Sequence, residues 1–180
     1  MNEGKRFEDN FYKSCGAQKI NVDRIPDSMS GFAGQNSICD FTVFKENLFY
    51  LELKTVRIGQ RFNFSSNIRV NQYDGLQEKL EYKKVIPGYI IKYYDTETPT
   101  NSKAFFMHQT TLTRKRADTN KGVSYQCCNK KSFSLKEAEE YLIPVKGQVK
   151  TVNYDWDVRY LLEELIERKA LNVWLLKKIK

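Results

Sequence analysis

The chain has 180 residues, 41% of them hydrophobic and 29% charged, which is ordinary for a globular protein and enough to bury a core without disulfides. Its 11 Tyr and 11 Phe argue against disorder. Thirty Lys and Arg against 22 Asp and Glu give a formal net charge of +8, which favours an anionic partner, nucleic acid ahead of a membrane.

Several other classes of protein are disfavoured. No apolar run approaches the roughly 20 residues of a transmembrane helix, and the polar residues 1–10 do not resemble a signal peptide. We therefore expect a cytoplasmic protein with no membrane partner. The four cysteines show no C-x-x-C spacing, so reduced structural thiols are favoured over a zinc site. A single histidine leaves little room for chemistry centred on a histidine base.

The first half of the chain begins with a predicted helix over residues 4–15, followed by a loop over 23–37 that is rich in Gly, Ser, Pro and Asp. Two apolar segments then predict strands over 38–44 and 48–55. Residues 45–47 would join these strands as a hairpin.

A second helix is predicted over residues 67–84, with Ser66 or Asn67 as its N-terminal cap. Its apolar stripe consists of Val70, Tyr73, Leu76 and Leu80. The aromatic and β-branched run 85–94 predicts a strand that is broken near its start by Pro87 and Gly88, and 104–108 could pair with it.

The remainder turns polar and basic over residues 113–131, where six Lys or Arg stand against one Asp. The capping-box spacing of Ser134 and Glu137 predicts a short helix to Leu142. An amphipathic helix is expected over 155–169, which could cover the sheet or serve dimerisation. We expect a last strand over 172–179 and one α/β domain spanning 1–180. Its parts are a core of about 4–112, a basic loop over 113–131, and C-terminal helices and a strand over 134–180.

The predicted hairpin brings acidic residues together. A three-residue turn places Phe44 opposite Leu48, and the same register places Asp40 opposite Glu52. Side chains alternate between the faces of a strand, so Lys54 shares the face of Glu52. Directly opposed Cβ atoms lie about 4.5–5.5 Å apart, which lets both carboxylates reach one cation. A turn of another length would break this register.

Two opposed carboxylates repel each other unless a proton or a cation intervenes. Hard oxygen ligands favour Mg²⁺, with Mn²⁺ as a substitute, over zinc. A metal held by Asp40 and Glu52 could lower the pKa of a bound water, and Lys54 could position that water or stabilise charge on a phosphate. The alternative is an exposed hairpin face on which the three residues form ordinary ion pairs.

Three segments carry a resemblance to a known family: GKRFEDNFYKSC, ICDFTVFKENLFYLELKT and FSSNIRVNQYDGL. They resemble the RecU-type Holliday junction resolvases, above all the shorter phage and bacterial relatives labelled penicillin-binding protein-related factor A. The resemblance covers roughly residues 4–94 and, more faintly, KKSFSLKEAEEYLIPV. It implies a restriction-endonuclease-like, PD-(D/E)xK core, with a central mixed β-sheet flanked by helices. It also implies a Mg²⁺-dependent homodimer that cuts four-way DNA junctions, in a bacterial cell or a phage-infected host.

The resemblance also implies roles for five residues. The family's helix acid corresponds to Glu8, its two strand acids to Asp40 and Glu52, its lysine to Lys54 and its helix glutamine to Gln72. Metal binding would fall to the three acids. From the residues alone, Glu8 could equally be a solvated helix acid, and Gln72 a residue at the boundary of the apolar stripe.

One segment departs from the family pattern. RecU proper has a long stalk between its first strands that engages the junction centre, whereas the equivalent stretch here, DRIPDSMSGFAGQNS, is short. Nicked, flapped or linear DNA therefore remain alternative substrates, and a non-catalytic DNA-binding protein on the same fold remains an alternative function. Phosphate contacts are expected from basic residues, namely Arg24, Arg57, Arg61, Arg69, Arg114, Lys115, Arg116, Lys130 and Lys131.

Overall fold

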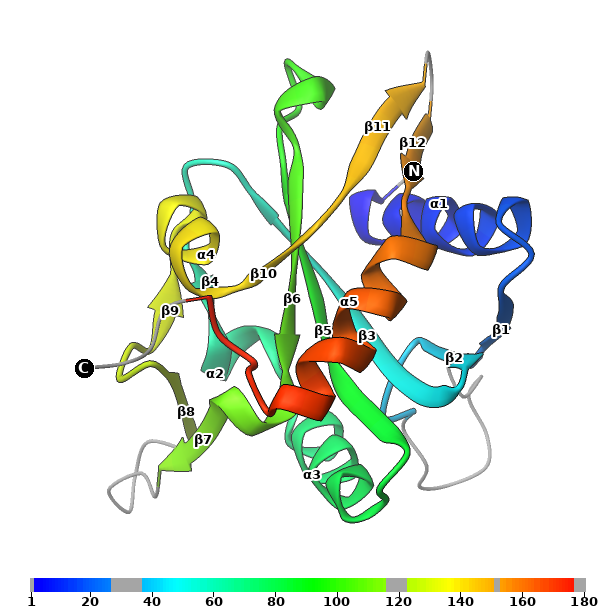
Figure 1. The fold of residues 1–180 in the computed structure, drawn as a ribbon. Helices are drawn as coiled ribbons and strands as arrows, with labels where there is room; N and C mark the ends of the chain where they lie inside the picture. Colours follow the sequence, from blue (N-terminus) through cyan, green and yellow to red (C-terminus); the bar gives the residue numbers. More distant parts are fainter. Residues whose placement is uncertain (1, 27–36, 116–122, 151–152, 177–180) are drawn as a thin grey trace, which may run out of the picture.

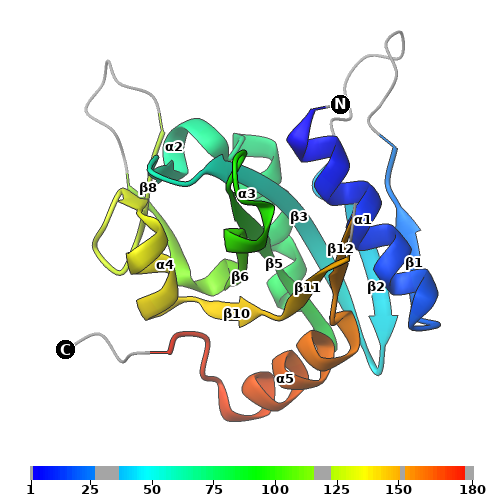
Figure 2. The same ribbon diagram turned by 90° about the horizontal axis from the view of Figure 1, so that it is seen from above.

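A six-stranded mixed β-sheet with helices on both faces forms the centre of the molecule (Figures 1 and 2). The computed structural model describes residues 2–26, 37–115, 123–150 and 153–176. This is the mixed α/β architecture, a central mixed sheet flanked by helices, that the sequence predicted.

The α-helices are α1 (Glu3–Ala17), α2 (Phe64–Asn67), α3 (Val70–Glu78), α4 (Leu135–Tyr141) and α5 (Val158–Leu171), and three short 3₁₀ helices are η1 (Lys79–Glu81), η2 (Pro99–Asn101) and η3 (Gln109–Thr111). The strands of the central sheet are β1 (Asn21–Arg24), β2 (Phe41–Lys45), β3 (Asn47–Arg57), β5 (Val85–Tyr94), β6 (Lys103–His108) and β10 (Ile143–Val145). Three two-stranded sheets pair β4 (Phe62–Asn63) with β9 (Ser132–Phe133), β7 (Leu112–Lys115) with β8 (Ser124–Cys127), and β11 (Gly147–Lys150) with β12 (Asn153–Trp156).

The strand order of the central sheet is β1-β2-β3-β5-β6-β10, and only the β3–β5 pair is parallel. Parallel neighbours need a crossover connection, and here α2, α3 and η1 supply it. α3 consequently packs on the face of the sheet that carries the even-numbered side chains of β3.

Two apolar clusters fill the space on either side of the sheet. The first lies under α1 and α5 and includes Phe11, Leu51 and Leu162. The second lies under α2 and α3 and includes Leu76 and Ile91. Figure 2 shows α1 and α5 on one side of the central strands and α2 and α3 on the other. The sheet is therefore covered on both faces.

The N-terminal helix and the hairpin confirm the sequence prediction. The pairing of β2 with β3 has the predicted register, with Phe44 opposite Leu48. The turn is tighter than expected, because the strands extend to Lys45 and from Asn47 and leave Glu46 between them at a φ of 55°. β1 also occupies 21–24, so the start of the loop predicted over 23–37 is a strand, while 27–36 lie outside the described residues.

The second predicted helix is divided. Residues 64–67 form the short α2, and α3 begins only at Val70, so neither Ser66 nor Asn67 caps it. Asn63 caps α2 by accepting from the N–H groups of Ser65 and Ser66. The predicted apolar stripe of this helix was also wrong at Val70, which is 44% exposed instead of buried.

β5 runs through Pro87 and Gly88 without the predicted break. Gly88 is required there by close packing against β6, because a Cβ would lie 2.5 Å from Phe106 Cζ and 2.6 Å from the Met107 carbonyl oxygen. The predicted pairing with the segment at 104–108 is confirmed, and Gly88 lies opposite His108.

The C-terminal part contains three corrections. The basic segment forms the β7–β8 strand pair where a loop was predicted, and residues 116–122 lie outside the described chain. The last helix begins at Val158 with Asp157 as its cap, because residues 153–156 form β12. The segment that follows has no strand over 172–176, and the rest of the strand predicted over 172–179 lies outside the described residues. The short helix after Ser134 is confirmed with its capping box.

Within the described ranges, none of the helices combines the length and the apolar character required to cross a membrane.

Candidate active site

A buried polar cluster lies between β3 and the first turn of α3. Glu52 is only 3% exposed, and its Oε1 accepts from Lys54 Nζ at 2.8 Å and from Gln72 Nε2 at 2.5 Å. Glu52 and Lys54 project from the same face of β3, as strand alternation requires. The structure therefore brings together three of the residues that the sequence analysis selected.

Gln72 links this cluster to the backbone of α3. Its Oε1 accepts from Lys54 Nζ at 3.1 Å and from the backbone N–H of Arg69 at 3.2 Å. One amide side chain thus caps the helix and holds both charged groups of β3. The helix is seated close to the sheet because Gly75 has no Cβ, which would otherwise collide with the Ile38 side chain.

Asp40 reaches the cluster from the residue that precedes β2. The β2–β3 ladder ends at the Phe41–Leu51 pair, so the predicted pairing of Asp40 directly opposite Glu52 is wrong in detail. The Asp40 N–H donates to the Leu51 carbonyl at 3.1 Å, and its Oδ2 accepts from the Leu53 N–H at 2.6 Å. The carboxylate itself thereby completes the end of the ladder and is fixed beside Glu52.

The electrostatics of the pair are unfavourable without a counterion. Burial first, and then the charge of Glu52, raise the pKa of Asp40 to about 7. Burial also raises the pKa of Glu52, against the lowering effects of Lys54, Gln72 and Arg69. Two neighbouring carboxyl groups in a desolvated site both have raised pKa values, because ionising both of them at once is energetically unfavourable.

The pair offers two carboxylate oxygens for a cation. Among the described residues, neither Asp40 Oδ1 nor Glu52 Oε2 has a hydrogen-bond partner. Carboxylate oxygens are the ligands that Mg²⁺ and Mn²⁺ prefer, so the donor set fits a hard divalent ion. The described chain contains no group of three His, Cys, Asp or Glu side chains arranged to hold a metal. The described part of the protein would therefore supply two acidic ligands to such an ion.

Glu8 does not join the other acids. It lies on α1, close enough for its charge to raise the pKa of Asp40, but its carboxylate forms an ion pair with Arg24 of β1. Arg24 also binds Asp9 at 2.8 Å. The predicted third metal ligand is thus held by an arginine that was itself predicted to contact DNA.

Tyr89 was not selected from the sequence, although it borders the cluster. It is paired with Glu52 in the β3–β5 ladder, is fully buried, and its hydroxyl has no partner in the described chain. Burial and then Glu52 raise the pKa of its phenol. The sequence 85–94 resembles an apolar strand, so nothing in it marks Tyr89 as a site residue. Only the parallel register of β3 with β5, which places Tyr89 beside Glu52, could have indicated it.

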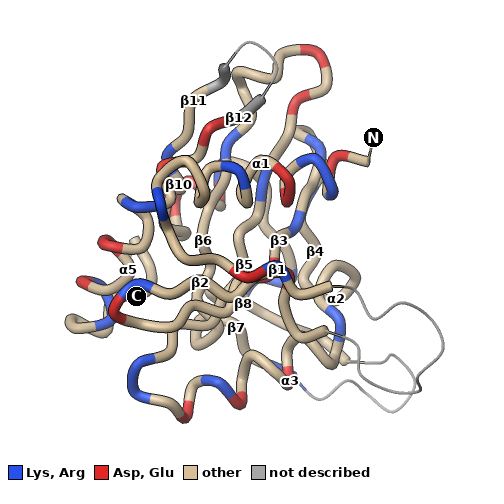
Figure 3. Tube along the Cα trace, turned by 90° about the vertical axis from the view of Figure 1, so that its right-hand side faces the viewer, with Lys and Arg blue, Asp and Glu red and all other residues tan. Residues whose placement is uncertain are grey.

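The predicted DNA-binding residues divide into two groups. Some are held by acids: Arg24 by Glu8 and Asp9, Arg61 and Lys130 by Glu137, and Arg114 by Asp74. Others are exposed and form no ion pair within the described chain, namely Arg57, Arg69, Lys115 and Lys131. Arg116 lies outside the described residues. Figure 3 shows basic and acidic segments interleaved along the chain, so the phosphate-binding surface stays a prediction.

The fold and the site together define a mixed α/β protein with a buried acid pair and an adjacent lysine. No family model matches the chain. The SPbeta prophage-derived uncharacterized protein YotM of Bacillus subtilis (strain 168) is 29% identical over 178 residues, covering 93% of this chain and 89% of that protein. A solved structure with some likeness is that of Hjc from Archaeoglobus fulgidus, a Holliday junction resolvase from an archaeal hyperthermophile. Its TM-score is 0.48 at 11% identity, over 78% of this chain and 95% of that one.

Proposed function

We propose that this chain is a Mg²⁺-dependent DNA endonuclease of the restriction-endonuclease-like class. Its substrate would be branched DNA, with four-way junctions first, during recombination or phage DNA processing. The observation that carries the proposal is the Asp40–Glu52 pair, whose raised pKa values and two unpartnered oxygens call for a cation beside Lys54. The resemblance of residues 4–94 to the RecU-type resolvases supports the choice of substrate.

The roles of the residues follow from the geometry. Asp40 and Glu52 would hold the Mg²⁺, for which Mn²⁺ could substitute. The bound ion would lower the pKa of a water and offset charge on the phosphate. Lys54 is held by Glu52 and Gln72, so its ammonium is already oriented to donate to a phosphate oxygen.

Gln72 is a positioning residue, because it touches Glu52 and Lys54 but contributes no charge. Glu8 remains a proposed third acid, and its recruitment requires Arg24 to exchange that carboxylate for a DNA phosphate. Such an exchange would couple DNA binding to completion of the site.

The proposal is tested by incubating the purified protein with a synthetic four-way junction and a linear duplex of matched sequence, each with Mg²⁺ or with EDTA. We expect cleavage of the junction with Mg²⁺ and none with EDTA. Equal cleavage of linear, nicked or flapped DNA would keep the nuclease chemistry and change the substrate. Tight binding without cleavage, with either Mg²⁺ or Mn²⁺, would favour a non-catalytic DNA-binding protein.

A further inference from the structure

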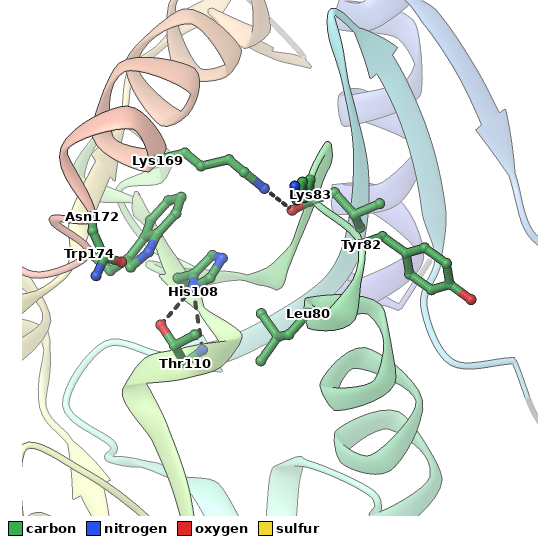
Figure 4. A pocket seen from close by; sticks show the side chains of 9 residues that line it. Leu80, Tyr82, Lys83, His108, Thr110, Lys169, Asn172 and Trp174 are labelled. Atoms are coloured by element: carbon green, nitrogen blue, oxygen red, sulfur yellow. Dashed lines mark hydrogen bonds between the residues drawn. The ribbon is translucent and has the colours of Figure 1, made fainter.

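A cavity of about 290 Å³ opens where η1 and the start of β5 meet the end of β6 and the segment after α5. Figure 4 shows His108 and Trp174 on one side of it, Leu80 and Tyr82 on the other, and the Lys169 side chain reaching across. Gln72 lies in the first turn of α3, whereas Leu80, which lines the cavity, lies just beyond the end of that helix, about 12 Å further along. The cavity is therefore separate from the acid pair.

His108 directs a hydrogen-bond donor into this cavity. Its Nδ1 accepts from the Thr110 N–H at 3.3 Å and lies 2.8 Å from Thr110 Oγ1. A ring nitrogen that accepts from a backbone N–H carries no proton, so the proton of the neutral ring is on Nε2. That nitrogen has no partner in the described chain although the residue is only 3% exposed, and Figure 4 shows it facing away from Thr110 into the open space.

The cations beside the cavity lack acidic partners. Lys169 Nζ donates to the Val85 carbonyl at 2.5 Å, is half-buried, and forms no ion pair with a described carboxylate. Burial lowers the pKa of its ammonium, which indicates a charge that an anion would stabilise. Lys83 is exposed at the rim, and no Asp or Glu is among the described residues that line the cavity.

Aromatic rings border these donors. Trp174 stacks on His108 with ring centroids 3.6 Å apart and the planes 4° from parallel, which fixes the imidazole. Tyr82 is 59% exposed at the rim, and Lys79 Nζ lies 5.9 Å from the centroid of its ring. Nucleobases stack readily on such exposed rings.

We propose that this cavity binds one nucleotide unit, with its phosphate held by Lys169, Lys83 and the Nε2–H of His108 and its base stacked against Tyr82. Its volume lies just below the range of roughly 300–1,000 Å³ that is usual for ligand pockets, so it suits one small ligand. The unit is either a free mononucleotide or one nucleotide of a DNA strand. The proposal does not depend on nuclease activity.

The test is calorimetric titration, in EDTA and low salt, with thymidine monophosphate, with thymidine, and with a short 5′-phosphorylated oligothymidylate. Without metal, the Asp40–Glu52 pair repels phosphate and should not contribute. Lys169→Met keeps the side-chain length and removes the charge, and Lys103→Met is the matched control on an exposed ion pair with Glu139. We expect the phosphorylated ligands to bind and Lys169→Met to weaken them about tenfold, with no change in the control.

Two further variants guard against misfolding. Lys83→Met alters an exposed rim residue and should also weaken binding about tenfold. His108→Phe keeps an aromatic ring on Trp174 and removes the N–H donor. Binding of the oligonucleotide alone, with the same lysine dependence, would identify a DNA strand as the source. Absence of binding by both phosphorylated ligands, or equal affinities for Lys169→Met and Lys103→Met, would overturn the proposal.

Discussion

At the scale of single residues, the candidate site contains two carboxylates of like charge that the surrounding contacts hold close together. Asp40 and Glu52 are held together by the backbone bond to Leu53 and by the Gln72 amide, although their charges repel. Lys54 offsets one of the two negative charges. Burial and the charge of Glu52 raise the pKa of the Asp40 carboxyl to about 7, so binding of a cation would stabilise the ionised pair. Carboxyl groups with raised pKa values are common in functional sites.

Asp40→Asn should abolish Mg²⁺-dependent cleavage and leave DNA binding unchanged or tighter, because it removes a metal ligand and a charge that repels phosphate. The amide can still accept from the Leu53 N–H, so the fold should be retained. Cleavage and gel-shift assays measure the two effects. Mg²⁺ should also raise the Tm of the wild-type protein and not that of the variant.

The matched control is Glu163→Gln, which removes one negative charge from the exposed surface of α5. It should cleave like the wild type. Full Mg²⁺-dependent activity in Asp40→Asn would contradict the assignment of this residue.

Lys54→Ala should lower the maximal cleavage rate by about 10²–10³, the usual effect of removing one preorganised donor to a developing charge. The apparent Mg²⁺ affinity should change much less, because Lys54 binds Glu52 Oε1 and leaves Oε2 free for the ion. Single-turnover rates over a Mg²⁺ titration separate the two quantities, with Lys103→Ala as control. A variant with the wild-type maximal rate and only a raised Mg²⁺ requirement would refute this role.

His108 should make the stability depend on pH in a predictable direction. Burial, followed by the charge of Lys169, lowers its pKa from 6.5 to about 3, so the folded protein holds the neutral ring and the unfolded chain takes up a proton below about pH 6.5. Stability is therefore lost as the pH falls from 6.5 towards 3. Between pH 7 and pH 5 this loss amounts to about 2 kcal/mol.

Urea denaturation of the wild type and of His108→Phe at pH 7 and pH 5 measures it. The chain has one histidine, so the variant removes the whole contribution while other titrating groups cancel in the comparison. Identical pH dependence in the two proteins would show that the ring is not held neutral.

The sequence indicated which residues form the candidate site, but it did not indicate most of the contacts between them. Asp40, Glu52 and Lys54 follow from strand alternation and one turn, both of which are local. The hydrogen bond from Gln72 to Glu52 joins residues that are 20 positions apart in the sequence. It depends on the crossover connection that places α3 against the sheet. The pairing of Glu8 with Arg24 was missed because the loop predicted from residue 23 concealed β1.

At the scale of elements, prediction succeeded where the pattern was local and periodic. α1 and the β2–β3 register are examples, since the tight turn at Glu46 determines every cross-strand pair. Prediction failed where tertiary packing decided the outcome. β5 continues through Pro87 and Gly88 because β6 packs directly on the glycine. β11 and β12 were missed, because a short pair of strands between polar residues shows little alternation.

The β7–β8 pair gives the basic segment a structure that the sequence did not indicate. Arg114 is anchored to Asp74 on α3, beside the candidate site, whereas Lys115 is exposed. Changing Arg114, Lys115 and Arg116 together to Ala should weaken junction binding. It should also reduce the log–log salt slope by about 2–3, at ~0.9 per phosphate contact.

Cleavage at saturating DNA and low salt should survive in this triple variant, because the Asp40–Glu52 pair is intact. The matched control changes three other lysines to Ala, namely Lys5 and Lys13 of α1 and Lys136 of α4. None of these three was predicted to contact DNA. A salt slope equal to that of the wild type would show that the charges of this segment merely face solvent.

At the scale of the whole molecule, the described part of each chain contains one buried acid pair, whereas the proposed function, resolution of a four-way junction, requires two cuts on opposite strands. The resemblance to RecU-type resolvases implies a homodimer, in which each protomer would make one cut. A closed two-fold assembly also matches the approximate symmetry of the junction. On the proposed function, the number of chains in the complex with DNA would therefore decide how many strands are cut.

Mixing the wild type with excess Asp40→Asn protein should produce complexes with one active protomer. On a supercoiled plasmid that extrudes a cruciform, we expect the wild type to yield linear DNA and the mixture to yield nicked circles, because only one strand is cut before the complex dissociates. Sedimentation of the protein with a junction gives the stoichiometry independently, with two chains expected per junction. Linear product from the mixture in proportion to the wild-type protein alone, together with one chain per junction, would show that a monomer makes both cuts in succession.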